Sequence, residues 1–251
     1  MDKTNSKNAG WRKEGFIGIL TIENQPENYL VNPEFISITR LESFLSEDIR
    51  GLIIAGSGRH FSAGADLKNI TTLAKNPEDL KIALTRGNQL LNFISQLEIP
   101  TLAAINGVCF GGGLEIALTC DIRFCTRRSL FAVPEINHNL IPGLAGLNRL
   151  QRICGQRNSM EILFSGDTIN ANKALELKIA DRIIDEQNLI DYCRNYLTGL
   201  IKGRSPEVIR MLMRSFRNAE YLSADEAMKE DVEIFCHLAG KFSATNDSFG
   251  L

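Results

Sequence analysis

The sequence lacks any run of about 18 apolar residues, and its N-terminal stretch MDKTNSKNAGWRKEG lacks the apolar core of a secretion signal. We therefore expect a soluble, cytoplasmic protein without a membrane partner. Neither charge is in large excess: 28 Lys and Arg face 30 Asp and Glu, which leaves a net charge of −2. That balance offers no broad basic surface to nucleic acid, although a local basic patch could still bind an anionic ligand.

The six cysteines are scattered, with no Cys-x-x-Cys pair and no two histidines at metal-ligand spacing. Reduced thiols are therefore expected, and no metal site. The GGG run at residues 111–113 is not followed by the Gly-Lys-Ser/Thr of a P-loop, and it does not match Gly-x-Gly-x-x-Gly. No Cys, Ser or acid lies at a suggestive spacing from His138, so a nucleophilic triad is disfavoured and a loop or pocket-wall histidine is expected.

The 251 residues, 44% of them hydrophobic, are enough for one large domain or for a core with a helical appendage. Apolar or alternating runs bounded by glycine or proline predict strands at residues 16–24, 51–56 and 101–105. Helical spacing of apolar residues predicts helices at residues 33–46 and 77–97, the first with Pro33 in its first turn. A further helix, two short strands and a loop are expected at residues 114–120, 122–125, 130–133 and 134–139.

The C-terminal part of the sequence is helical in pattern. Ser205 precedes a proline, and Ser223 is followed three residues later by Glu226, which is the signature of a capping box. An α/β core at residues 1–200 and a helical region at residues 201–251 are therefore predicted.

Three segments carry the most specific chemistry: HFSAGADL (60–67), GVCFGGGLEIALTCDI (107–122) and VPEINHNLIPG (133–143). Their small residues would let two backbone N–H groups approach one ligand oxygen, which bulkier side chains would shield. Glu115 and Glu135 would then supply proton transfer. A carbonyl polarised toward an enolate, with two acids near its Cα and Cβ, is what the addition of water to an activated alkene requires.

Each of these residues also has a structural interpretation. Glu115 lies in the first turn of its expected helix, where the helix dipole favours a carboxylate by about 0.3–1 kcal/mol. Glu135 could be solvated in a loop, Asp66 could be the N-cap of a helix beginning at Leu67, and the glycines could form only tight turns. The combination of all these features, in order within one stretch of the chain, favours the functional interpretation.

These segments, with AAINGVCFGGGLEIALTCDIRF and the downstream FSGDTINANKALELKIADRII, resemble the crotonase superfamily, the enoyl-CoA hydratase/isomerase family. The resemblance begins near Gly15 and covers nearly the whole chain. It implies an α/β fold: a crotonase-like spiral of ββα units with a C-terminal α-helical region. It further implies a thioester-binding, catalytic core and a helical region that serves oligomerisation and covers the active site.

The resemblance assigns the oxyanion-hole amides to Ala65 and Gly112. It assigns catalysis to the pair Glu115 and Glu135 without saying which is the base and which the acid, and we assign water activation to Glu115 and protonation of Cα to Glu135. The remaining substrate-binding residues that it implies are Ala63, Asp66, Leu67, Lys68 and Gly143, the last through an amide that would help to hold the catalytic water. Departures from the family pattern follow both Glu135 and Gly143, so the identity of the acyl group is not carried over.

Retention of both glutamates favours an enoyl-CoA hydratase, a hydro-lyase of fatty acid metabolism that adds water reversibly and syn to a 2-enoyl thioester. The family chemistry needs no metal or redox cofactor, because coenzyme A is part of the substrate. The alternatives are an enoyl-CoA delta-isomerase, which would need only one of the acids, and a dehydratase acting on a carrier-protein-bound acyl thioester in a polyketide or secondary pathway. A non-enzymatic, scaffolding or RNA-binding member of the fold is a further alternative.

The expected partners are an acyl-CoA or acyl-pantetheine substrate, with an acyl carrier protein as an alternative carrier, and further copies of the chain. A homotrimer or hexamer is implied by the resemblance. The helical region supports this assembly with apolar faces that one core would not fully cover. The residues of these faces are Met211, Leu212, Phe216, Ile234, Phe235 and Leu238.

Overall fold

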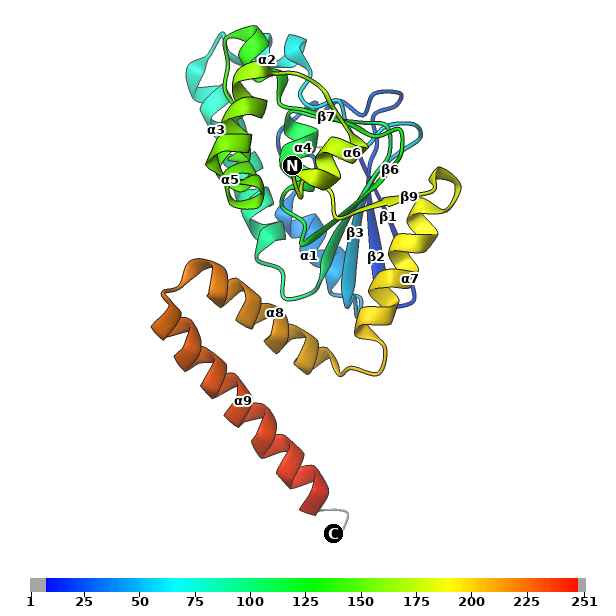
Figure 1. Cartoon of the computed structure of the whole chain (residues 1–251), viewed down its shortest axis with the longest axis vertical. Helices are drawn as coiled ribbons and strands as arrows, with labels where there is room; N and C mark the ends of the chain where they lie inside the picture. Colours follow the sequence, from blue (N-terminus) through cyan, green and yellow to red (C-terminus); the bar gives the residue numbers. More distant parts are fainter. Residues whose placement is uncertain (1–7, 248–251) are drawn as a thin grey trace.

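The computed structural model describes residues 8–247. Within them, two β-sheets form the centre of the molecule (Figure 1). The six-stranded sheet has the order β1-β2-β3-β4-β6-β9, and the three-stranded sheet the order β5-β7-β8. The strands are β1 (Ala9–Glu14), β2 (Ile17–Ile22), β3 (Gly51–Gly56), β4 (Thr101–Ile105), β5 (Val108–Phe110), β6 (Ile122–Thr126), β7 (Leu130–Ala132), β8 (Ile169–Asn170) and β9 (Arg182–Ile184).

The large sheet is parallel from β2 to β9, and only β1 pairs antiparallel with its neighbour. Parallel strands covered on both faces need apolar residues on both faces, which explains the continuous run GLIIAG of β3. Leu52 and Ile54 of this strand belong to the larger hydrophobic cluster, whereas Ile53 belongs to a second cluster. The predicted α/β class is confirmed.

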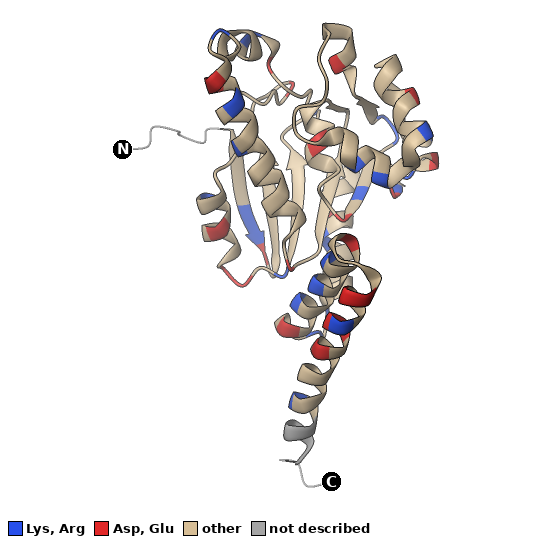
Figure 2. Cartoon of the chain, turned by 90° about the vertical axis from the view of Figure 1, so that its left-hand side faces the viewer, with Lys and Arg blue, Asp and Glu red and all other residues tan. Residues whose placement is uncertain are grey.

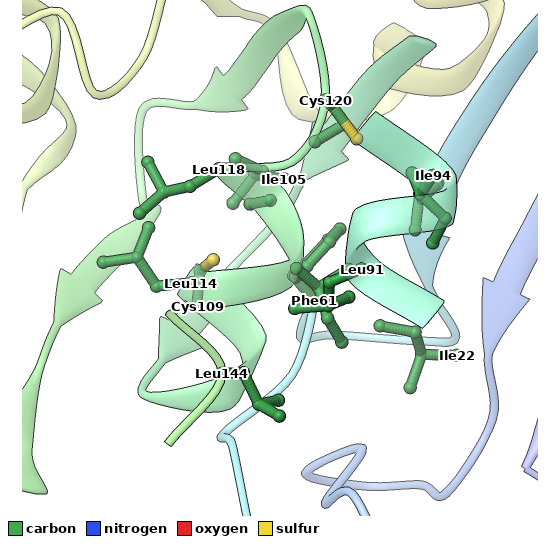
Figure 3. Packing of buried hydrophobic residues seen from close by; sticks show 14 of the residues in the cluster. Ile22, Phe61, Leu91, Ile94, Ile105, Cys109, Leu114, Leu118, Cys120 and Leu144 are labelled. Atoms are coloured by element: carbon green, nitrogen blue, oxygen red, sulfur yellow. The ribbon is translucent and has the colours of Figure 1, made fainter. Parts of the chain in front are cut away.

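Helices cover both faces of the large sheet. Helix α7 (Leu189–Ile201) lies over the second cluster through its buried side chains, which are Leu189, Cys193, Leu197 and Ile201. On the other face the fully buried Phe61 lies beside Leu91 of helix α3 (Pro77–Ser95), with Leu114 of helix α4 (Gly112–Ala117) in the same cluster (Figure 3). This packing places Leu114, near the start of α4, in the same hydrophobic cluster as Leu52 and Ile54 of β3.

The predicted strands and long helices are present, but two expectations need correction. Helix α1 (Ile38–Leu45) begins after Ser37, whose hydroxyl accepts a hydrogen bond from the Arg40 N–H, so Pro33 lies outside the helix and not in its first turn. Residues 134–138 form the 3₁₀ helix η1 instead of a loop, because Pro134 suits a first turn and Asn139 ends it in the left-handed region. Strand β1 was not predicted, because its sequence AGWRKE is polar.

Helix α2 (Leu67–Leu73) follows Asp66, and the remaining helices follow strand β7 in the chain. Helix α5 (Gly146–Ser165) bends at Gly155, where φ is +79°. The others are α6 (Ala171–Glu176), the 3₁₀ helix η2 (Glu186–Asn188), α8 (Pro206–Tyr221) and α9 (Ala224–Asp247). In the part of the chain that the structure describes, no helix is long and apolar enough to cross a membrane.

Helices α8 and α9 pack against each other and extend away from the sheets (Figures 1 and 2). Both predicted caps are present: Ser205 accepts from the Val208 N–H, and Ser223 and Glu226 exchange hydrogen bonds as a capping box. Arg217 of α8 donates to Asp121 Oδ1 at 2.6 Å and so ties the helix to the end of α4 and the start of β6. The division of labour between residues 1–200 and 201–251 stays a prediction.

Candidate active site

Every residue that the sequence assigned to the site lines one cavity of about 640 Å³. These residues are Ala63, Ala65, Asp66, Leu67, Lys68, Gly112, Glu115, Glu135 and Gly143. They come from the segment entering α2, the N-terminus of α4, η1 and the loop before α5. A larger cavity of about 900 Å³, between the core and α8, contains none of them.

The backbone amides of Ala65 and Gly112 share a corner of this cavity. Leu30 donates to Gly64 O and accepts from the Asp66 N–H, and in such a parallel bridge the N–H of the intervening residue, Ala65, points away from the partner segment. Gly112 is the first residue of α4, where an N–H has no partner within the helix. A Cβ on Gly112 would lie 3.9 Å from Ala65 N, so the two amides are neighbours.

Two glycines bring these backbones together. Gly64 has φ +87°, and a Cβ there would lie 2.7 Å from Phe110 O and 3.3 Å from Gly112 N. Gly111 has φ +48°, and its Cβ would lie 2.7 Å from Glu135 Oε1. A side chain at either position would combine an unfavourable backbone conformation with a clash, so glycine is required for the close approach.

A buried asparagine holds the segment that carries Ala65. Asn28 donates through Nδ2 to Ser57 O at 2.8 Å and to His60 O at 2.7 Å. The backbone carbonyl oxygen of Asn28 accepts from Ser62 Oγ at 2.7 Å, and that hydroxyl in turn accepts from the Gly64 N–H at 3.1 Å. Apart from its position in a turn-rich segment, Asn28 has no sequence feature that would predict this role.

Glu115 is buried, and its carboxyl group is held by one oxygen. Oε1 accepts hydrogen bonds from the Leu144 N–H and the Gly146 N–H, both at 2.8 Å. Burial raises the pKa of Glu115 to about 7, and repulsion from Glu135 adds to this rise, while the two N–H donors and the positive charge of Arg149 oppose it. A carboxyl group with a pKa near 7 can both take up and release a proton at neutral pH.

Glu135 projects from η1 toward the same region. Burial raises its pKa, partly opposed by a hydrogen bond from its own backbone amide and by the nearby His138. Its Oε2 atom is buried without a hydrogen-bond partner among the described residues. Because Glu135 repels the charge on Glu115, the two carboxyl groups favour unlike protonation states.

Asp66 has the structural role that its position suggested. Its carboxylate accepts from the Lys68 N–H at 2.9 Å and caps α2. Gly143 is fixed through its carbonyl oxygen, which accepts from Asn88 Nδ2 at 2.9 Å, whereas the contact of its amide with a water stays a prediction. His138 lines the cavity wall. Among the described residues, no group of three or more His, Cys, Asp or Glu side chains is arranged to hold a metal ion.

Sequence reasoning missed the contacts that position Glu115. The amides of Leu144 and Gly146 belong to the run LAGL. Its departure from the family pattern was linked only to the acyl pocket and not to Glu115. Arg149, on the first turn of α5, donates through Nη1 to Leu144 O at 2.6 Å. A side chain that acts on a backbone carbonyl five residues away has no sequence signature.

The parallel sheet, the glycine-lined amide pair and the two glutamates that line one cavity are the features of a crotonase-type enzyme. The chain belongs to the enoyl-CoA hydratase/isomerase family, whose family model matches residues 19–247. It is 34% identical over 223 residues to a probable enoyl-CoA hydratase from Bacillus subtilis, covering 88% of this chain and 86% of that protein.

Solved structures agree with this family membership. An enoyl-CoA hydratase subunit I from Geobacillus kaustophilus superimposes with a TM-score of 0.82 at 27% identity, covering 93% of this chain and 90% of the other. The DspI protein of Pseudomonas aeruginosa gives a TM-score of 0.86 at 26% identity, covering 95% and 90% respectively. The crotonase-like fold predicted from the sequence is thereby confirmed.

Proposed function

We propose that the protein is an enoyl-CoA hydratase that adds water reversibly and syn to the double bond of a 2-enoyl thioester. The observation that carries the proposal is the pair Glu115 and Glu135, two carboxyl groups with raised pKa values that line the same cavity as two neighbouring backbone amides. The names of the relatives support the same activity.

The amides of Ala65 and Gly112 would bind the thioester oxygen. As water adds at Cβ, negative charge moves onto this oxygen, and donors already aimed at it stabilise the enolate-like state without reorganisation. One such donor contributes about 2.7–4 kcal/mol in comparable oxyanion holes. This interaction strengthens in the transition state, so it raises kcat and not substrate affinity alone.

The two carboxyl groups divide the proton transfers. Glu115, ionised and held through Oε1, takes a proton from water while the water oxygen bonds to Cβ. Glu135, protonated, gives its proton to Cα on the same face, and the electron pair of the double bond forms the new Cα–H bond. One carboxylate gains a proton and one carboxylic acid loses one, so a proton exchange between them restores the starting state.

The rest of the cavity suits a pantetheine thioester. Ala63, Asp66, Leu67 and Lys68 line the cavity next to Ala65 in the sequence, and Gly143 lines it from the loop before α5. Apolar side chains from α2, α3 and the loop after η1 offer a surface for the acyl group. They are Ile70, Leu73, Leu80, Leu84, Leu140 and Ile141. No step of the proposed mechanism uses a metal or a redox cofactor.

The experiment that tests this function compares Glu115→Gln and Glu135→Gln in hydration of enoyl-CoA thioesters over a panel of chain lengths. The substitutions keep size and remove proton transfer, so each should lower kcat strongly while the protein stays folded. Because the two groups act together, the double variant should lose far less than the product of the single losses. Activity that survives Glu115→Gln but not Glu135→Gln would instead identify an isomerase.

The choice between coenzyme A and carrier protein is tested by comparing the two thioesters of one acyl group. We propose the coenzyme A ester as the substrate, and faster turnover of the carrier-protein ester would identify the dehydratase alternative.

We also propose that the enzyme assembles as a trimer or hexamer. Leu212, Phe216 and Phe235 are 57%, 60% and 72% exposed on α8 and α9, so these helices leave large apolar side chains uncovered that a neighbouring copy could bury. Light scattering should give a mass of three or six chains. A monomer at micromolar concentration would contradict the assembly but not the activity.

A further inference from the structure

The loop that holds Glu115 is itself held at three successive peptide groups. Gly143 O accepts from Asn88 Nδ2 at 2.9 Å, and the N–H of the same peptide group, that of Leu144, donates to Glu115. Two peptide groups later, Ala145 O accepts from the Arg149 backbone N–H at 3.3 Å, and the Gly146 N–H also donates to Glu115. Each outer peptide group is therefore fixed at both ends.

The middle peptide group, between Leu144 and Ala145, is fixed by a side chain. Its carbonyl oxygen accepts from Arg149 Nη1 at 2.6 Å. This group lies at a sharp turn, because Ala145 has φ +60°, in the left-handed region that non-glycine residues adopt only under constraint. Its tilt sets the relative direction of the two flanking N–H groups, so it decides whether both reach the same carboxyl oxygen.

Arg149 reaches this loop from outside the candidate active site. Its side chain lines the cavity of about 900 Å³ near α8 and not the cavity of about 640 Å³ that contains Glu115 and Glu135. It is half-buried, and burial lowers the pKa of its guanidinium group. A charged group kept in such surroundings needs compensating contacts, and the Leu144 carbonyl supplies one.

We propose that Arg149 is a positioning residue for the hydration reaction, which holds the Leu144–Ala145 peptide group so that two amides converge on Glu115 Oε1. The inference rests on the proposed function. Arg149 contacts neither the substrate nor the reacting atoms in this assignment, and it acts only through the loop. Its second effect is electrostatic, because its positive charge lowers the pKa of Glu115.

The charged groups around this pair come from four elements. Glu115 lies on α4 and faces Glu135 of η1. Arg149 faces Arg152 on its own helix and Glu220 and Tyr221 on α8. Glu220 already accepts from Arg152 Nη1 at 2.6 Å, so its charge is partly neutralised by another arginine.

The test compares Arg149→Met and Arg149→Lys with the control Arg157→Met. Arg157 lies on the same helix, is highly exposed, and bonds only through Nε to Glu161 at 3.2 Å in the contacts that the structure describes. Kinetics of enoyl-thioester hydration are measured across pH with each variant. Arg149→Met should lower kcat about 10- to 100-fold with little change in KM, since it weakens an interaction of the transition state.

The pH profile separates positioning from general support of the fold. In Arg149→Met the acid limb of kcat should move to higher pH, because the lost charge and the loosened amides both favoured ionised Glu115. Arg149→Lys keeps the charge, so the acid limb of its kcat profile should stay closer to that of the unaltered protein, while kcat itself is still reduced. Arg157→Met should change neither quantity.

The proposal is overturned if folded Arg149→Met matches Arg157→Met, if its loss appears in KM alone, or if kcat falls while the acid limb stays in place. Should Arg149→Met not fold, an Arg149→Lys variant with full kcat overturns it. The ¹³C resonance of the Glu115 carboxyl, assigned by its loss in Glu115→Gln, gives the same titration without turnover. Absence of hydration in the unaltered protein would refute the proposed function, whereas the titration would still decide the role of Arg149.

Discussion

Replacement of Gly146 by alanine should disable Glu115 while the protein stays folded. A Cβ at Gly146 would lie 2.6 Å from Glu115 Cγ, 2.8 Å from Oε1 and 3.0 Å from Cδ. Carbon atoms pack at about 3.5–4.0 Å, so the carboxyl group must move by about 1 Å. Glu115 is only 3% exposed, and any displacement would move its Oε1 away from the Leu144 and Gly146 amides that now hold it.

The magnitude follows from this displacement. Overpacking of a buried site costs about 1–3 kcal/mol, and alanine at a helix start returns up to about 1 kcal/mol of helix propensity. The net loss of stability should therefore be at most about 2–3 kcal/mol. A catalytic group displaced by about 1 Å can cost about 100-fold in rate, so kcat should fall by roughly that factor.

The assay follows the loss of absorbance of the conjugated enoyl thioester, together with thermal unfolding of the same samples. Gly199→Ala is the matched control, because Gly199 lies in α7 and an added Cβ there meets nothing within 4 Å. Gly146→Ala with kcat/KM within about twofold of the control would refute the reasoning, since Glu115 would then tolerate a displacement that the mechanism forbids.

Four further predictions concern Gly112, Glu115 and Arg217. Gly112→Pro should lower kcat by about 100- to 1000-fold with a smaller effect on thioester binding, because proline suits the first position of α4 but removes the N–H donor. Equal losses in kcat and in thioester binding would refute an oxyanion role. Hydration should fall below a pH of about 7 as Glu115 becomes protonated, and an unchanged acid limb in Glu115→Asp would assign it to another group. Since folding raises the pKa of Glu115 from 4.5 to about 7, its contribution to stability is complete below pH 4.5 and is lost as pH rises to about 7. As pH rises over that range, the free energy of unfolding of Glu115→Gln, measured with urea, should therefore increase relative to that of the unaltered protein by on the order of 3 kcal/mol. Arg217→Met should cost about 1–3 kcal/mol in the same assay by releasing α8 from Asp121, and an unchanged midpoint would show that the helix is held otherwise.

The sequence was most informative where one local signal determined one local structure. Asp66, Ser205 and Ser223 cap helices as their spacing indicated, because a cap depends only on a side chain and an N–H within three residues. Strands β3 and β4 were likewise readable, since a strand buried on both faces must be apolar at every position.

Features that depend on tertiary contacts were not readable. Strand β1 is polar, and it is a strand because it pairs with β2 at the edge of the sheet and stacks Trp11 on Phe44 at 4.7 Å. Helix α1 begins at Ile38, later than Pro33 suggested, because Phe35 and Ile36 are buried in the preceding loop. In both cases packing outweighed local preference.

The candidate site shows the same division in its chemistry. The motifs predicted that Glu115 and Glu135 lie near glycine turns, but they do not predict how strongly either carboxyl group is shielded from water. Burial sets the pKa of Glu115, and burial is a property of the whole fold. The glycines are the exception, because each marks a contact: Gly111 lies against Glu135 and Gly146 against Glu115. At Gly111, within the family motif, the missing Cβ therefore marks where the backbone approaches a carboxyl group, whereas Gly146 has the same role outside that motif, in the run LAGL.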